Sequence, residues 1–303
     1  MSAQEREALI QMLRSGGPDL AAPLPQAREN FEAMFAGMPI PDDVTFEATT
    51  IAGLPARWST TPGASKDRVL LYLHGGGYLL GSSLAYRPLY SALGRAAGAR
   101  GLCVDYRLAP EDPFPAAVDD ALAAYRALLD QGVAPGAIAI AGDSAGGGLT
   151  VATLVAARDA GLAMPAAAIA ISPFSDLACT GASMATKASE DPSLNKDGLL
   201  AMAATYLNGA PSTSPLASPY YANLSGLPPL LIQVGSIEVL LNDATGLAAR
   251  AGEAGVAVQL EVWPGMPHVW HGFSFMLSEG RDAIAAAGAF AAARFQQSKA
   301  AHE

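Results

Sequence analysis

The sequence predicts an α/β fold in which a mostly parallel sheet is covered by helices on both faces. Two short runs, RVLLYL at residues 68–73 and PLLIQV at residues 229–234, are apolar on both sides, as strands covered by helices are. Longer segments with apolar residues three and four positions apart separate such runs and have the periodicity of helices. A third run, AIAIA at residues 137–141, leads through glycines into small residues that suit a helix packed closely on the sheet.

Length and composition are those of a globular protein. The chain has 303 residues, enough for a full core in one large α/β domain or in two average domains. Hydrophobic residues make up 51% and charged residues 15%, which argues against a disordered chain. The net charge of −10, without a Lys/Arg-rich run, argues against nucleic acid or an anionic membrane as a partner.

Cysteine usage and the N-terminus favour a cytoplasmic protein. Cys103 and Cys179 lie among apolar or small residues without a C-x-x-C spacing, which indicates reduced thiols. The N-terminus, MSAQEREALIQML, mixes charged and apolar residues and lacks the pattern of a signal peptide. No apolar run approaches the roughly 20 residues that span a bilayer. We therefore expect a cytoplasmic location and no membrane insertion.

The N-terminal part is predicted to be helical and to precede a strand pair. Residues 1 to about 40 fit two helices with no strand between them. Residues 44–52 and 54–59 fit two strands joined at Gly53. The apolar side of the helices is either plain core or the wall of a pocket, and comprises Leu9, Met12, Leu13, Phe31, Met34 and Phe35.

A glycine loop, HGGGY at residues 74–78, follows the strand at residues 68–73. Three glycines after a strand could hold a phosphate, but no Lys-Ser/Thr follows them, so a phosphate-binding loop is disfavoured. The better interpretation is an oxyanion hole, in which the backbone N–H groups of Gly75 and Gly76 stabilise a developing negative charge. His74 is expected to hydrogen-bond the loop into shape and not to carry a proton.

The motif G-x-S-x-G occurs at residues 142–146, between the strand and the helix predicted there. In a chain with 31 glycines the motif alone is a weak signal. A strand before it and a helix after it favour a nucleophile elbow, the sharp turn that exposes a serine hydroxyl. Ser144 is therefore the candidate nucleophile.

Between these two motifs the sequence predicts a helix at about residues 83–97, a strand at residues 101–105 and a helix at residues 115–129. The last of these follows a proline-rich turn, YRLAPEDPFPA. Within this turn, Arg107 and Glu111 are expected to form an internal ion pair.

The three motifs together resemble the bacterial hormone-sensitive-lipase family (family IV) of α/β-hydrolases. Members of that family carry YRLAPE-x-PFPA between HGGG and GDSAGG, and the resemblance covers about residues 45–275. Asp112 departs from the His that is common at its position. The resemblance implies an α/β-hydrolase fold with an eight-stranded, mostly parallel sheet, helices on both faces and a split helical cap.

The later elements complete this fold. Residues 177–212 contain one predicted helix (residues 196–207) and no strand, which is typical of a lid inserted between strands. We expect a single catalytic domain made of cap 1–42, core 43–176, cap insertion 177–212 and core 213–303. The other expected elements are strands at residues 165–171, 229–234 and 256–262 and helices at residues 244–255 and 281–297.

Two carboxylates compete for the role of catalytic acid. Aligning VGSIEVLLND with the family's Asp-x-Leu-x-Asp segment puts Glu238 at the position of the catalytic Asp, and α/β-hydrolases accept either acid. Asp243 is the rival, but it falls at the start of a predicted helix, where an acid commonly interacts with the helix dipole.

Two histidines compete in the same way. His268 stands third after Gly265 in WPGMPH, which resembles the family's Gly-Met-x-His spacing, and is favoured. His271 mimics the H-G-F ending of the family's loop, but choosing it would need three extra residues there.

These assignments predict a carboxylesterase acting on short- to medium-chain esters. Ser144 attacks, His268 transfers protons and Glu238 orients the imidazole, with no metal or organic cofactor. The oxyanion hole is expected to comprise Gly75, Gly76 and Ala145, and the substrate-binding set to comprise Tyr78, Asp143, Met202 and Tyr206.

The alternatives are a serine amidase or peptidase with the same triad, and a small-molecule receptor on the same fold. An intact Ser, Glu and His in chain order argues against the receptor. The expected partner is a small-molecule ester substrate. The edge strand at residues 256–262 could also pair with its twin in a homodimer, as the resemblance implies.

Overall fold

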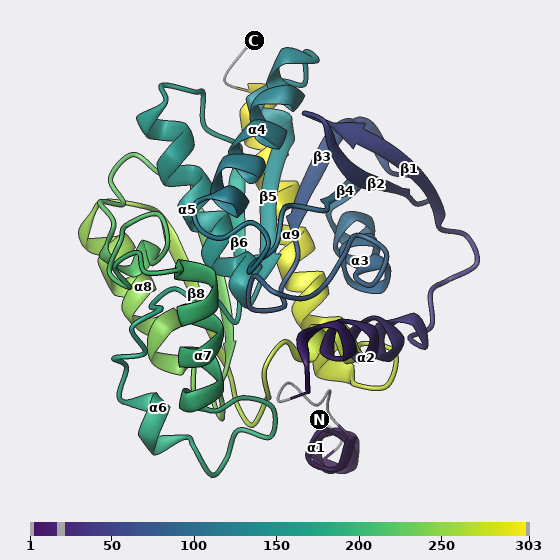
Figure 1. Cartoon of the computed structure of the whole chain (residues 1–303). Coiled ribbons are helices and arrows are strands. Elements are labelled where there is room, and N and C mark those ends of the chain that lie inside the picture. The colour runs from purple at the N-terminus through teal and green to yellow at the C-terminus, as the bar shows by residue number, and fades with distance from the viewer. Residues whose placement is uncertain (1–2, 17–21, 301–303) are drawn as a thin grey trace.

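The strands form a sheet whose order differs from their order in the chain. The computed structural model describes residues 3–16 and 22–300, and residues 1–2, 17–21 and 301–303 lie outside this description. Over the described residues the sheet has eight strands in the order β1-β2-β4-β3-β5-β6-β7-β8, which confirms the predicted fold class (Figure 1). The strands are β1 Thr45–Ile51, β2 Leu54–Thr60, β3 Ser65–Leu73, β4 Ala99–Val104, β5 Ile138–Asp143, β6 Ala167–Ile171, β7 Leu230–Gly235 and β8 Val258–Trp263.

The strand pairing brings several loops to one edge of the sheet. β1 pairs with β2, and β2 with β4, in antiparallel fashion. From β4 through β8 every ladder is parallel. Because parallel strands end at the same edge, the segments after β3, β5, β7 and β8 meet there, which is where open α/β sheets bind ligands.

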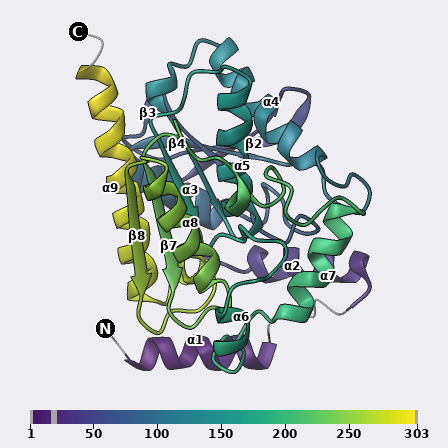
Figure 2. The same ribbon diagram turned by 90° about the vertical axis from the view of Figure 1, so that its left-hand side faces the viewer.

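Helices cover both faces of the sheet, as predicted. On one face, α3 and α9 pack with α2 around one cluster of buried apolar side chains. On the other face, α4, α5 and α8 share a second cluster with α7 (Figures 1 and 2). The helices of the described residues are α1 Ala3–Gly16, α2 Leu24–Ala36, α3 Arg87–Ala97, α4 Ala116–Asp130, α5 Ala145–Asp159, α6 Ser183–Thr186, α7 Lys196–Leu207, α8 Leu241–Glu253 and α9 Ser278–Ala300.

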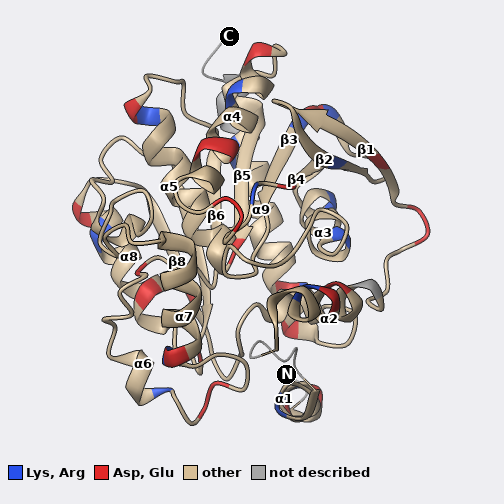
Figure 3. Cartoon of the chain, viewed as in Figure 1, with Lys and Arg blue, Asp and Glu red and all other residues tan. Residues whose placement is uncertain are grey.

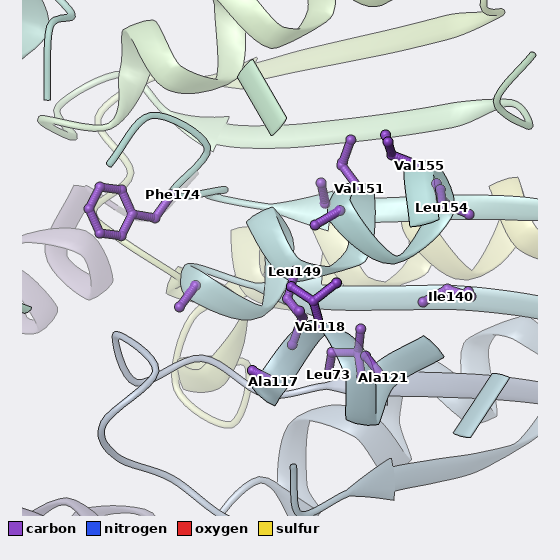
Figure 4. Close-up of a cluster of buried hydrophobic side chains, with 14 of the residues drawn as sticks. Leu73, Ala117, Val118, Ala121, Ile140, Leu149, Val151, Leu154, Val155 and Phe174 are labelled. Carbon is purple, nitrogen blue, oxygen red and sulfur yellow. The ribbon is translucent and has the colours of Figure 1, made fainter. Parts of the chain in front are cut away.

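The helix after β5 lies unusually close to the sheet. Every residue of α5 from Ala145 to Ala157 is buried. A Cβ atom added to Gly146 would clash with the carbonyl oxygen of Leu73 in β3, so the glycine permits this approach. Figure 4 shows the apolar side chains of α5, among them Leu149 and Val151, within the surrounding cluster.

The predicted elements are found with shifted ends. α3 begins at Arg87 and not at residue 83, with Pro88 in its first turn, where proline is well tolerated. α7 has the predicted bounds, and the Asn195 side chain caps it by accepting a hydrogen bond from the Gly198 N–H at 2.9 Å. The short helix α6 was not predicted, because four residues are too few to show a helical period.

The expected ion pair between Arg107 and Glu111 is wrong. Arg107 instead forms a forked pair with Asp120 of α4, with Nη2 2.7 Å from Oδ1. Glu111 pairs with Arg28 of α2 at 2.7 Å. Arg28 also donates from Nε to the carbonyl of Leu79 at 2.9 Å, so it ties α2 to the loop after β3. These partners lie too far away in sequence for local spacing to predict them.

The remaining features concern the surface and the ends of the sheet. Figures 1 and 2 show α1, α2, α6 and α7 at the same end of the molecule. Figure 3 shows Lys and Arg on several different elements, among them α2, α3 and α4. Cys103 and Cys179 are free thiols and both are buried. Within residues 3–16 and 22–300, no helix is long and apolar enough to cross a membrane.

Candidate active site

Segments from distant parts of the chain line a cavity of about 390 Å³ at the end of the molecule where α1, α2 and α7 lie. Its wall takes residues from α1, α2, the glycine loop, the β5–α5 turn, residues 192–202 and the segment after β8. Of the apolar residues that were either core or pocket wall, Leu9 is fully buried in a core cluster and Met12 is 40% exposed. The remaining members of that set line the cavity: Leu13, Phe31, Met34 and Phe35.

Ser144 lies on a sharp turn between β5 and α5 and lines the cavity. Its backbone has φ 53° and ψ −122°, a conformation that is strained for a residue with a side chain. Gly142 and Gly146 make the turn possible, because a Cβ at either position would clash with neighbouring backbone. The Ser144 N–H donates to the carbonyl of Ile171 at 2.8 Å, which fixes the turn to β6. This geometry is that of a nucleophile elbow.

His268 lines the same cavity and is held by a buried carboxylate. Its Nδ1 lies 2.9 Å from Oε2 of Glu238, which is fully buried. This contact fixes the orientation of the ring and leaves its other nitrogen, Nε2, free to accept or donate a proton. Burial lowers the pKa of His268, but the hydrogen bond to Glu238 and the negative charge of nearby carboxylates outweigh it and raise the pKa above its usual value.

Glu238 is positioned by a residue that sequence reasoning missed. The Ser172 hydroxyl donates to Oε1 of Glu238 at 2.7 Å, and the Gly235 N–H donates to the same oxygen at 2.6 Å. The Ser172 hydroxyl also accepts the Val269 N–H at 3.2 Å. Ser172 therefore joins the turn that carries Glu238 to the loop that carries His268. No motif marks Ser172, because its partners lie 66 and 97 positions away.

The rival acid and the rival histidine have other partners. Asp243 accepts hydrogen bonds from the N–H groups of Ser175 and Asp176 at 3.0 and 2.9 Å, and burial raises its pKa well above the usual value. His271 contacts Oε1 of Gln233 through Nε2 at 2.9 Å. It is fully buried, which lowers its pKa to about 3. Neither residue lines the cavity that Ser144 enters.

One of the two loop N–H groups expected to form the oxyanion hole, that of Gly75, is not available for this role. The Gly75 N–H donates to Oδ1 of Asp143 at 3.0 Å, so this group is already occupied. Gly76 and Gly77 line the cavity, whereas Gly75 does not. Both have positive φ, 111° and 63°, which turns the backbone in a way that favours glycine. The expectation that Gly75 serves as an oxyanion donor is therefore wrong, and Gly77 is the additional loop residue at the cavity.

Asp143 supports this loop from beneath. Its carboxylate also accepts the hydroxyl of Tyr72 at 2.6 Å and that of Tyr86 at 3.1 Å. Burial raises the pKa of Asp143 to about 6, although these hydrogen bonds and the charge of His268 oppose the shift. Asp143 borders the cavity, but both of its carboxylate oxygens accept hydrogen bonds from other residues of the protein. Its geometry therefore fits a support for the loop better than a direct contact with substrate.

His74 has the expected structural surroundings. Its Nδ1 lies 2.8 Å from the Gly75 carbonyl, and its ring stacks on Tyr106 at 4.3 Å between centroids. The residue is fully buried, and burial lowers its pKa. Burial therefore favours the neutral imidazole, and the two contacts hold the ring within the loop, away from the cavity lining.

The predicted substrate-binding residues divide into two groups. Met202 of α7 lines the cavity. Tyr78 and Tyr206 do not, because their rings stack on each other with centroids 3.8 Å apart and planes at 6°. Both tyrosines are buried, so the expectation that they bind substrate is wrong. They join the glycine loop to α7 instead.

A second recess of about 470 Å³ lies between α2 and α7. It shares Met202 and Leu199 with the first cavity, along with three residues of the intervening walls. Met202 also packs against the glycine loop, because a Cβ added to Gly77 would clash with its sulfur. Over the described residues, no group of three or more His, Cys, Asp or Glu side chains is placed to hold a metal ion.

Known proteins are similar to this chain in both fold and sequence. The family model described as the alpha/beta hydrolase fold matches residues 70–272. The crystal structure of an esterase from the bacterial hormone-sensitive lipase (HSL) family is similar with a TM-score of 0.93 and 49% identity, over 97% of this chain and 99% of that one. The chain belongs to the bacterial HSL family of α/β-hydrolases. This confirms the resemblance to the bacterial hormone-sensitive-lipase family that the sequence motifs indicated.

Two further comparisons extend this HSL-family relationship. An acetyl-hydrolase of Streptomyces hygroscopicus is 54% identical over 244 residues, which are 80% of this chain and 81% of that protein. The crystal structure of EstE5 soaked by p-nitrophenyl butyrate has a TM-score of 0.94 and 48% identity, over 97% of this chain and 100% of that one. The chain is accordingly a hydrolase of the HSL family, as expected.

Proposed function

We propose that this HSL-family chain is a carboxylesterase that cleaves short- to medium-chain esters through an acyl-enzyme intermediate. One observation carries the proposal. Ser144, on its strained turn, shares a cavity with His268, whose Nδ1 lies 2.9 Å from the buried carboxylate of Glu238. A histidine that is oriented by a carboxylate and shares a cavity with a serine is the arrangement that activates a hydroxyl for attack.

The proposed reaction has two halves. Ser144 Oγ bonds to the acyl carbon while Nε2 of His268 accepts the hydroxyl proton, and the carbonyl electrons move onto oxygen. Collapse of this intermediate breaks the ester bond, and the leaving alkoxide takes the proton from His268. A water molecule then attacks the acyl-serine with His268 as base, which releases the carboxylic acid and restores Ser144.

The oxyanion of each intermediate would be stabilised by backbone N–H groups. We assign this role to Gly76, Gly77 and Ala145, because the two glycines line the cavity and Ala145 begins α5 directly after the nucleophile. Loss of one such donor typically costs roughly 3–4 kcal/mol of transition-state stabilisation. Asp143 would act on these donors indirectly, through its hydrogen bond from the Gly75 N–H.

The substrate range follows from the size and lining of the cavity. A volume of about 390 Å³ with a largely apolar lining suits a small ester, and the name of the acetyl-hydrolase relative and the soaking of EstE5 by p-nitrophenyl butyrate support short acyl groups. We propose acyl chains of roughly two to eight carbons. The segments that supply much of this wall, within residues 1–42 and 177–212, would form the cap over the catalytic core.

The test of this function is Ser144→Ala. The substitution removes one oxygen from the turn, so we expect turnover of p-nitrophenyl butyrate to fall by about 10⁴-fold or more with an unchanged melting temperature. Labelling by a fluorophosphonate probe should be lost in parallel. If Ser144→Ala keeps near-normal kcat, the proposed mechanism is wrong.

A further inference from the structure

A single carboxylate links the wall of the cavity to the turn that carries the proposed acid. Asp191 follows α6, and Ser193 and Leu194 directly after it line the cavity. Its Oδ1 accepts the N–H groups of Ser193 and Leu194 at 2.9 and 3.0 Å. Its Oδ2 accepts the N–H of Val239 at 2.9 Å, and Val239 is the residue next to Glu238. One side chain thus bonds to both segments.

The link to Val239 is enclosed and doubled. Val239 is fully buried and Asp191 is only 9% exposed, so water competes little for these bonds. Ser183, at the start of α6, donates its hydroxyl to the Val239 carbonyl at 2.5 Å. Both backbone groups of Val239 are therefore held by the segment from residue 183 to residue 191. Hydrogen bonds from a buried N–H to a carboxylate are stronger than neutral ones, and an N–H left unpaired there is costly.

Asp191 also acts on His268 through its charge. The carboxylates that favour the protonated imidazole are Glu238, Asp191 and Asp143. The charge of His268 also acts on His271, which burial keeps neutral because its pKa is lowered to about 3. Removing the charge of Asp191 should therefore move the pKa of His268 downward, whereas a change that only loosens packing at the surface would not.

We propose that Asp191 is a positioning residue, which fixes the Glu238 turn against the cavity wall and thereby keeps the Glu238–His268 pair aligned with Ser144. This inference rests on the proposed function, because it assigns Asp191 to the proposed triad. It predicts that Asp191 is one of the bonds, beside that of Ser183, through which the cap insertion holds the triad in place. A displacement of a catalytic group by about 1 Å can cost about 100-fold in rate, so a small shift of the turn is sufficient.

The test begins with Asp191→Asn. The amide has the same size but cannot present carboxylate oxygens to all three N–H groups. With p-nitrophenyl butyrate we expect kcat to fall about 10- to 100-fold and KM to stay within about threefold, since the cavity keeps its lining. A base must be neutral to act, so the acid limb of the kcat/KM profile should move to lower pH as the pKa of His268 falls.

A matched control and a charge-preserving variant complete the experiment. Asp197→Asn removes an equal charge from the exposed first turn of α7, and should change neither kcat nor the acid limb. Asp191→Glu keeps the charge but lengthens the side chain, so we expect the acid limb to return toward that of the wild type while kcat stays lowered. Thermal melting is recorded for every variant.

The outcomes separate this inference from the proposed function. If Asp191→Asn melts as a folded protein but matches Asp197→Asn in kcat and acid limb, the inference is overturned. If Asp191→Asn does not fold, a kcat of Asp191→Glu within twofold of the wild type overturns it. Inactivity of Ser144→Ala beside a normal Asp191→Asn would refute only the positioning role. An active Ser144→Ala would refute the triad itself.

Discussion

Glu238 and Asp243 stand five positions apart, and their surroundings give them different chemistry. Glu238 forms a hydrogen bond with His268. Asp243, in the first turn of α8, accepts hydrogen bonds from two backbone N–H groups outside that helix. We expect Glu238→Gln to lower kcat by about 10³- to 10⁴-fold, because an amide holds the wrong tautomer of the imidazole. Asp243→Asn should stay within about tenfold, since its amide oxygen can still accept the same N–H groups. Steady-state kinetics on one ester would compare them, and the reverse ranking would move the acid role to Asp243.

At the residue scale, spacing within a motif was informative and contacts between distant segments were not. Ser144 could be singled out because it follows a strand within G-x-S-x-G, and Glu238 and His268 because their segments resemble those of the family. Gly75 was misassigned because its N–H is used by Asp143, a contact across 68 positions that no local pattern reveals. Asp191 was missed for the same reason. Its bond to Val239 exists only after the strands are ordered in the sheet.

At the scale of elements, α7 separates the cavity from the neighbouring recess through Met202. Met202→Ala should join the two spaces and raise the ratio of kcat/KM for octanoate over butyrate esters by at least about tenfold, because burying even two of the four extra methylenes gains roughly 1.6 kcal/mol at about 0.8 kcal/mol each. Leu200→Ala, on the 37% exposed side of the same helix, is the control. A p-nitrophenyl ester series would measure both ratios. Equal ratios in the two variants would show that Met202 does not limit chain length.

The elements themselves were largely predictable, and their mutual contacts were not. Apolar runs located the central strands, and α7 was predicted with its observed bounds, since helical periodicity and a capping Asn agree there. The choice between core and pocket wall for α1 and α2 could not be made from periodicity, because both uses bury the same apolar side. The ion pair of Arg28 with Glu111 joins α2 to the segment after β4 and links residues 83 positions apart.

At the scale of the whole molecule, His271 should make the fold sensitive to acid. The folded chain leaves it neutral until its pKa of about 3, whereas the unfolded chain protonates it below about pH 6.5. The unfolded state therefore holds more protons between these values, and the free energy of unfolding falls as pH falls. Urea unfolding at pH 7 and pH 4.5 should show that the wild type loses about 2–3 kcal/mol more than His271→Gln.

In His271→Gln, the side-chain amide can donate a hydrogen bond to Oε1 of Gln233 in place of the imidazole. Asp143 shifts stability in the opposite sense, since its pKa is raised to about 6, but it does so equally in both proteins. His271→Gln should also retain activity within about tenfold at pH 7. An inactive His271→Gln beside an active His268→Ala would instead make His271 the base.

The eight strands and their mostly parallel pairing could be predicted from the sequence only with the family resemblance. Residue patterns alone indicated strands covered on both faces, but not that β4 lies between β2 and β3. Strand order depends on pairing between segments far apart, such as β2 with β4, which begin 45 positions apart in the chain (Leu54 and Ala99). The family resemblance implied the number of strands and their mostly parallel pairing, but the order of the strands came from the structure.

The two sulfhydryl groups of the chain have a practical consequence for spectroscopy. Burial raises the pKa of Cys103 well above its usual value and that of Cys179 to about 12, so neither forms the thiolate that reacts with maleimides. A cysteine introduced at the exposed Leu200 would therefore be labelled selectively, with both native residues left in place. A single fluorophore on α7 could then report whether this helix moves when an ester enters.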